Sequence, residues 1–408
     1  MNAAAPNPTP QAGRATAWKV CLAGMLALSV AMGIGRFAFT PLLPMMLHEG
    51  SLNLQMGGWL ATANYLGYFI GAMLCALRRS DKPVPLIRGG LVATILLTLG
   101  MGLLHDDAVW LGLRFLSGVA SAYVFVYTAG WCLQQLTQLK HPELGGVIFC
   151  GPGIGIAVSG LLTGAMVTAG WLAASGWIAF GLISLLLTGL IWKTFQFDAG
   201  HAQNGASTAH ADNLRQGSPE QKREVRQQVI AYGMAGFGYI ITATFLPVIA
   251  RQALPGSNWP DFFWPIFGFG VALGAFGATR LPVHGDQRRL LACSYVMQAA
   301  GVALSILLPN AIGFALSCLL LGLPFTAITL FAMREARRLR QAQASSLMGL
   351  MTAAYGIGQI AGPPLATALV RSSGSFTPSL CVAVAALLLG ALLYYRLTLS
   401  HKLASKAA

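Results

Sequence analysis

The chain has 408 residues, of which 55% are hydrophobic and only 9% are charged. Soluble domains are about one quarter charged, so this composition excludes a fold whose whole surface faces water and predicts one that faces lipid. The net charge of +14 would favour nucleic-acid binding in a soluble protein, but the positions of the basic residues argue for a different explanation.

The apolar residues fall into twelve stretches long enough to cross a membrane, for which about 20 residues are needed. They are 18–47, 57–77, 86–104, 108–136, 144–168, 172–195, 228–251, 259–279, 290–308, 311–333, 344–370 and 376–398. The connections between them are short except for the polar segment 196–227, which separates six helices from six. The predicted fold is an all-α membrane protein of two pseudo-symmetric six-helix bundles. Its predicted units are a tail (1–17), a bundle (18–195), a linker (196–227), a bundle (228–398) and a tail (399–408).

The basic residues predict the orientation of these helices. If the N-terminus is cytoplasmic, only Arg251 and Arg371 of the 26 lysines and arginines fall in outer connections, and Arg36 and Arg114 lie within helices. Cytoplasmic loops of membrane proteins carry such an excess of basic residues. Both termini and the linker are therefore predicted to be cytoplasmic. Anionic lipid head groups are the expected partner of this charge, and nucleic acid is not.

Related segments recur six helices apart. Gly33-Ile34-Gly35 in the first predicted helix and Gly236-Phe237-Gly238 in the seventh are each followed by aromatic residues, threonine and proline. Glycine–proline segments also occur in the fifth helix at 151–155 and in the eleventh at 358–364. Because each half has six helices, both halves have the same orientation. This parallel repeat is typical of transporters that work by rocking.

In these segments the chain resembles the major facilitator superfamily and, within it, the YbfB/YjiJ-like branch. Segments 33–41 and 59–68 carry the resemblance to the branch, and Arg114-Phe115-Leu116-Ser117-Gly118 resembles the superfamily pattern RxxxG of helix 4. The superfamily signature between helices 2 and 3 is poorly matched at 77–83. The resemblance implies a secondary transporter whose central cavity is lined by helices 1 and 4 among others.

The helix 5 segment resembles a glycine–proline motif seen mainly in exporters, which implies bending during transport. The residues expected to permit bending and close packing are Gly151, Pro152, Gly155, Gly362 and Pro363. The chain has no GxxxxGK[ST] motif, its seven histidines are scattered, and its seven cysteines lack zinc spacing. An enzyme, an ATP-driven pump, a cofactor and a metal site are therefore not expected.

Two arginines within predicted helices are the main candidates for substrate binding. An arginine at the bilayer centre costs about 2.5–3.5 kcal/mol by insertion scales, and no Asp or Glu lies well inside the first six helices. A transported anion could supply the missing charge at Arg36 and Arg114. Alternatively, each arginine bonds helix carbonyls, amides and water and fixes packing. The rest of the candidate substrate site is Asn64, Tyr65, Tyr127, Tyr239 and Gln359.

Coupling to protons would need a titratable group near the transport path. The candidates are Asp261 and Glu49, both at outer helix ends, whereas Glu335 beside Arg334 is expected to form a gate or surface pair. The sequence favours efflux of a small organic anion or amphiphile by alternating access. The alternatives are uptake of an anionic metabolite by proton symport and a membrane sensor that does not transport. The expected setting is the bacterial inner membrane, with the chain as a monomer.

Overall fold

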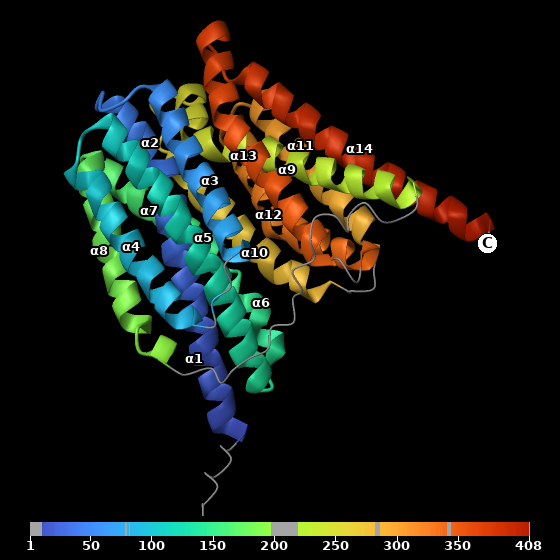
Figure 1. Ribbon diagram of the computed structural model, residues 1–408. Helices are drawn as coiled ribbons and strands as arrows, with labels where there is room; N and C mark the ends of the chain where they lie inside the picture. Colours follow the sequence, from blue (N-terminus) through green and yellow to red (C-terminus); the bar gives the residue numbers. More distant parts are fainter. Residues whose placement is uncertain are drawn as a thin grey trace, which may run out of the picture.

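The computed structural model describes residues 10–77, 80, 82–196, 219–281, 286–340 and 344–407, which are helical apart from short connections (Figure 1). No strand occurs among these residues. The elements are α1 (Pro10–Leu28), η1 (Ser29–Arg36), α2 (Phe39–His48), α3 (Leu54–Leu77), α4 (Pro83–Leu103), α5 (Asp107–Gln138), η2 (Pro142–Leu144), α6 (Gly145–Ile148), α7 (Gly151–Thr168), α8 (Ala173–Ile191), η3 (Thr194–Gln196), α9 (Pro219–Ala253), α10 (Pro260–Arg280), α11 (Gln287–Leu307), α12 (Ala311–Leu339), α13 (Ala344–Ser373) and α14 (Thr377–Ala407).

Eleven helical segments within the described residues are long and apolar enough to cross a bilayer, so the chain is a multi-pass membrane protein. The first, Gly13–His48, runs through α1, η1 and α2, and the fifth, Pro142–Thr168, joins η2, α6 and α7. The helix α13 has 30 residues but is not among the eleven, and it carries Tyr355 and Gln359 along its length. The count of twelve spans stays a prediction.

Several helices extend beyond their predicted ends. The helix α1 begins at Pro10, within the predicted tail 1–17, and α14 continues to Ala407. The helix α9 begins at Pro219, inside the predicted linker, whose residues 197–218 lie outside the described part of the chain. The predicted ends follow hydropathy, but Glu, Gln, Lys and Arg are good helix formers in water. A helix therefore continues where its apolar stretch stops.

Close helix contacts in the first half of the chain recur in the second half at a constant offset in residue number. A Cβ on Gly155 of α7 would lie 2.6 Å from the carbonyl oxygen of Ser29 and 2.7 Å from the Cα of Gly33 in η1. The same packing recurs 203 residues later, where Gly358 of α13 lies against the backbone of Gly233 and Gly236 in α9. Only glycine permits backbones to approach this closely.

The same offset of 203 residues relates the contact of α3 with α5 to the contact of α10 with α12. Gly67 and Gly71 of α3 lie against the backbone of α5, and Gly270 and Gly274 of α10 lie against the backbone of α12. This offset also corrects the pairing inferred from sequence for helices 5 and 11. The segment GPGIG at 151–155 corresponds to AYGIG at 354–358, not to the glycine–proline segment 358–364, because Gly155 packs on Gly33 and Gly358 packs on Gly236, and only this register aligns both partners.

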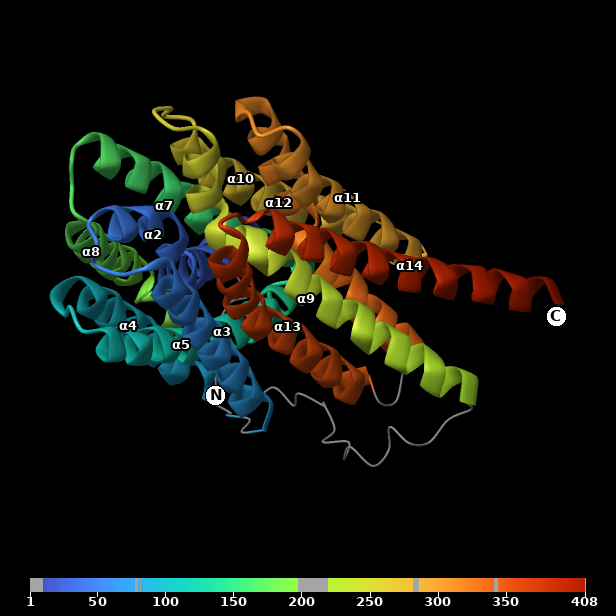
Figure 2. The ribbon, with the colours of Figure 1, turned by 90° about the horizontal axis from the view of Figure 1, so that it is seen from above.

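Several helix pairs join the first half of the chain to the second, among them α2 with α9, α3 with α13, α6 with α10 and α7 with α10. Of these, α3 and α13 lie side by side in both ribbon views (Figures 1 and 2). Gly146 of α6 and Gly153 and Gly160 of α7 recur every seven residues and face α10. At Gly153 a Cβ would meet the backbone of α10, so the two backbones lie in close contact there.

The predicted bending residues lie at such contacts. Gly151 lies against the backbone of Met25 in α1, and Gly362 lies against the side chain of Ile240 in α9. Pro152 is in the first turn of α7, and Pro363 is inside α13. Gly151 and Gly362 thus have a packing role, and bending during transport stays a prediction.

Replacing Gly155 by alanine is expected to destabilise the protein by about 1–3 kcal/mol, as overpacking of a close contact does. The new methyl group would meet the backbone of η1, which a side-chain rotation cannot relieve. Gly189→Ala on α8 is the matched control, because nothing lies within 4 Å of a Cβ there. Thermal unfolding in detergent measures both, and equal melting temperatures would contradict the close contact.

Candidate functional site

The candidate site is built around an interruption in the first membrane-spanning segment. Between α1 and α2 the chain forms a π-helical stretch, η1, which ends at Arg36, and the amide of Phe37 donates to the carbonyl of Met32. Such wider turns frequently occur at functional sites. Several backbone carbonyls of η1 accept side-chain donors from α5. One is Ala31, whose carbonyl accepts from the hydroxyl of Ser121 at 2.8 Å.

Arg114 is the principal donor to this interruption. Its Nη1 donates to the carbonyl of Gly35 at 3.1 Å, and its Nη2 donates to the carbonyl of Arg36 at 3.0 Å. The hydroxyl of Ser117 donates to the same Gly35 carbonyl at 2.8 Å. The side chain is buried, with Phe39 stacked on its guanidinium. These contacts match the packing alternative for Arg114, because both of its terminal nitrogens bind backbone oxygen.

Asn64 belongs to the same packing unit. Its Nδ2 donates to the backbone carbonyl of Arg114 at 3.0 Å, which joins α3 to α5. The Oδ1 of Asn64 is buried and has no hydrogen-bond partner among the described residues. Asn64 thus supports the helix that carries Arg114.

Arg36 differs from Arg114 in its partners. Its Nη2 donates to Oε1 of Gln359 on α13 at 3.0 Å, and Nε2 of Gln359 donates to the hydroxyl of Tyr239 on α9. Three predicted site residues from distant parts of the chain thus meet at one point. Arg36 is only 3% exposed, and its Nε has no hydrogen-bond partner within the described residues. Among the described residues, no carboxylate lies within 4.0 Å of Arg36.

Aromatic rings surround the Arg36 guanidinium. Its Cζ lies 4.0 Å from the ring centroid of Tyr68, 5.2 Å from that of Tyr65 and 5.3 Å from that of Phe37. The hydroxyl of Tyr65 is 2.9 Å from Oγ1 of Thr244. Tyr68 was not among the predicted site residues, although its i, i+3 spacing from Tyr65 places both on one helix face. That spacing is the sequence signal that could have found it.

Tyr127 lies apart from this group. Its ring packs on Tyr123 with centroids 5.9 Å apart. It follows Arg114 by thirteen residues on α5, which corresponds to about 20 Å along a helix. Tyr127 is therefore closer to the N-terminal side of the molecule, meaning the side where α1 begins and α3 and α5 end.

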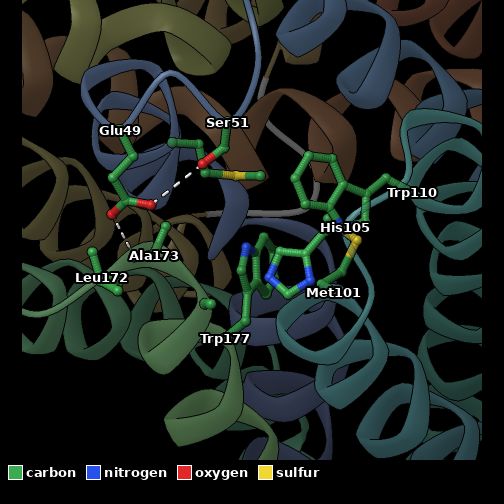
Figure 3. A pocket seen from close by; sticks show the side chains of 10 residues that line it. Glu49, Ser51, Met101, His105, Trp110, Leu172, Ala173 and Trp177 are labelled. Atoms are coloured by element: carbon green, nitrogen blue, oxygen red, sulfur yellow. Dashed lines mark hydrogen bonds between the residues drawn. The ribbon is translucent and has the colours of Figure 1, made fainter.

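The two predicted coupling residues lie at the opposite side, where α2 ends. Asp261, in the first turn of α10, pairs with Arg251 at the end of α9. Oε1 of Glu49 accepts from the amide of Ala173 at 2.7 Å and so caps α8. Glu49 also lines a hollow of about 220 Å³ with His105, Trp110 and Trp177 (Figure 3). Their coupling role stays a prediction.

Glu335 does not form the expected surface pair beside Arg334. It is 1% exposed and accepts from Arg288 at 2.5 Å and from Arg338 at 2.8 Å. Arg288 in turn pairs with Glu224 and donates to the carbonyl of Leu397 at 2.9 Å. These residues lie on α9, α11, α12 and α14, so the cluster joins four helices of the second half of the chain.

Comparison with known proteins agrees with the resemblance. A family model described as "Uncharacterised MFS-type transporter YbfB" matches residues 28–395. The match includes every residue around Arg36 and both copies of the repeated helix contacts. No curated protein sequence matches the chain.

Proposed function

This chain belongs to the family of YbfB-like MFS-type transporters, and we propose that the solute it carries is a small organic anion, with Arg36 as its counter-charge. The observation that carries the proposal is that Arg36 is buried within a membrane-spanning segment and has no carboxylate partner among the described residues. Intramembrane charges usually face a partner or a substrate path because burial in lipid is costly. A neutral amide, Gln359, does not balance the charge of the guanidinium.

The contacts between the two halves support alternating access as the mechanism. Thr40 donates to the carbonyl of Ala243, Tyr65 bonds to Thr244, and α7 packs on α10. We propose two six-helix bundles that rock about these contacts, with the N-terminal side in the cytoplasm. Arg36 and Gln359 come from different bundles. An anion bound at Arg36 would take the place of Gln359 and alter a contact between the two bundles.

The proposed direction is efflux across the bacterial inner membrane, with uptake of an anionic metabolite by proton symport as the alternative. The glycine–proline segment 151–155 favours efflux. In either direction of transport a bound monoanion neutralises Arg36. The protein with its solute bound can then change conformation without an unbalanced charge inside the membrane. The basic residues of the cytoplasmic side would contact anionic lipid head groups.

Thermal unfolding of the purified protein against a panel of solutes tests this proposal. We expect organic anions to stabilise it, by about 2.7 kcal/mol at one hundred times the dissociation constant, and cations and neutral amphiphiles to have no effect. Anions that stabilise should also exchange across proteoliposomes. Stabilisation by cations or neutral amphiphiles alone would overturn the anion assignment, and binding without exchange would indicate a sensor.

A further inference from the structure

We infer that the preferred anion is a monocarboxylate with a planar aromatic body, an inference that rests on the function proposed above. Three properties of the surroundings of Arg36 lead to it: the number of available cationic groups, the state of the neighbouring polar groups, and the arrangement of the aromatic rings.

The first property limits the charge of the ligand. Of the two buried arginines near the site, Arg114 binds the carbonyls of Gly35 and Arg36 with both terminal nitrogens. In the described part of the chain, Nη2 of Arg36 donates to Gln359 and its Nε has no hydrogen-bond partner. A carboxylate that displaced the Gln359 amide would take the Nε and Nη2 hydrogens together, which is the bidentate geometry arginine favours. One available cation fits one carboxylate, because a second would remain buried without a counter-charge.

The second property limits the polarity of the rest of the ligand. Two pairs of polar groups beside Arg36 are already hydrogen-bonded within the protein: Gln359 with Tyr239, and Tyr65 with Thr244. Further from Arg36, the hydroxyl of Tyr232 donates to Thr329 at 3.1 Å. A ligand with several hydroxyl groups would lose water and find few replacement partners here. An apolar ligand group has no hydrogen bonds with water to lose.

The third property concerns shape. The ring of Tyr239 packs on Phe325 with centroids 5.0 Å apart and stacks on Tyr355 at 5.8 Å, and Tyr355 packs on Tyr232 at 4.8 Å. These rings extend from Gln359 towards the N-terminal side. Tyr68, Phe325 and Tyr355 are only half-buried, although Arg36 is buried. A ligand that approached Arg36 from the N-terminal side would contact the faces and edges of these rings. An aromatic ring in the ligand could stack on them or pack edge to face.

Matched ligands separate these requirements in a thermal-unfolding titration of the full-length protein. Benzoate is compared with cyclohexanecarboxylate (same charge, non-planar), lactate (small and hydroxylated), phthalate (two carboxylates) and benzamide (no charge). We expect benzoate to bind most tightly. Tyr68→Leu and Phe325→Leu should each weaken benzoate about two- to tenfold, the range that aromatic pairs provide, and should leave the weaker binding of lactate unchanged. Tyr395→Leu, an exposed position on α14, is the control.

The outcomes distinguish this inference from the proposed function. If cyclohexanecarboxylate or lactate binds as tightly as benzoate, or if neither ring variant weakens benzoate, the aromatic class is wrong while anion binding stands. Tighter binding of phthalate would show that a second cation takes part. If none of the anions binds, the proposed function itself fails. Two ring variants on different helices are used so that misfolding of one does not decide the result.

Discussion

Arg36→Ala is expected to raise the dissociation constant of the transported anion by about 30-fold to a few thousand-fold. Truncating one partner of a buried, hydrogen-bonded charge pair costs about 2–5 kcal/mol, and each 1.4 kcal/mol corresponds to a factor of ten. Arg114 binds backbone carbonyls with both terminal nitrogens, whereas Nη2 of Arg36 binds the side chain of Gln359. Thermal shifts measure binding, and anion exchange in proteoliposomes measures transport.

Companion variants show whether the effect comes from the charge. Arg36→Lys keeps the charge but loses the planar guanidinium group that binds a carboxylate through two hydrogen bonds. This variant should therefore retain part of the anion binding. Gln359→Glu would give Arg36 a permanent carboxylate partner and should remove anion binding as completely as Arg36→Ala does. Arg371→Ala, at an exposed position, should change nothing. If Arg36→Ala binds the anion with unchanged affinity, Arg36 is a packing residue and the anion proposal is wrong.

The sequence was sufficient to predict a multi-pass membrane protein and to name Arg36, Tyr239 and Gln359 as candidate site residues, although their mutual contacts are seen only in the structure. Polar residues isolated in long apolar stretches indicate function, because few polar side chains are tolerated in lipid. These residues lie on helices that the family resemblance places around a central path. The match of the YbfB family to residues 28–395 confirms the resemblance.

The same reasoning could not separate Arg36 from Arg114. Both are isolated arginines in apolar stretches, and the difference lies in the backbone. Arg114 binds carbonyls at the end of η1, and a π-helical turn leaves no pattern of side chains by which it could be predicted. Tyr68 was missed for a related reason. A tyrosine in a membrane helix has many possible roles, and only the 4.0 Å stacking on Arg36 identifies this one.

The partners of Glu335 were also beyond prediction from sequence. Arg334 is its neighbour in sequence, but successive helical residues point in different directions, and Arg334 instead contacts the carbonyl of Leu281. The actual partners come from the start of α11 and from α9, distant in sequence. Side-chain charge alone does not indicate which distant helix end lies nearby.

Glu335→Ala is expected to destabilise the protein by about 3–5 kcal/mol, the typical cost of removing one partner from a buried ion pair. Arg288 is 4% exposed and would keep only Glu224 as a carboxylate partner, while Arg338 would lose both of its bonds to Glu335. Chemical or thermal unfolding in detergent measures the loss. Glu143→Ala is the control, because Glu143 pairs with His141 at an exposed position, where ion pairs contribute little.

A double-mutant cycle with Arg288→Ala shows whether the cluster acts as one unit. If Arg288 and Glu335 stabilise the protein mainly through each other, the double variant should be much less destabilised than the sum of the two single variants. Such coupling would join α9, α11, α12 and α14 at one end, as a bundle that moves as one body requires. Additive single effects, or a loss for Glu335→Ala no larger than that for Glu143→Ala, would mean that these helices are held together by apolar packing alone. The second half would then have no charge cluster that holds it rigid during rocking.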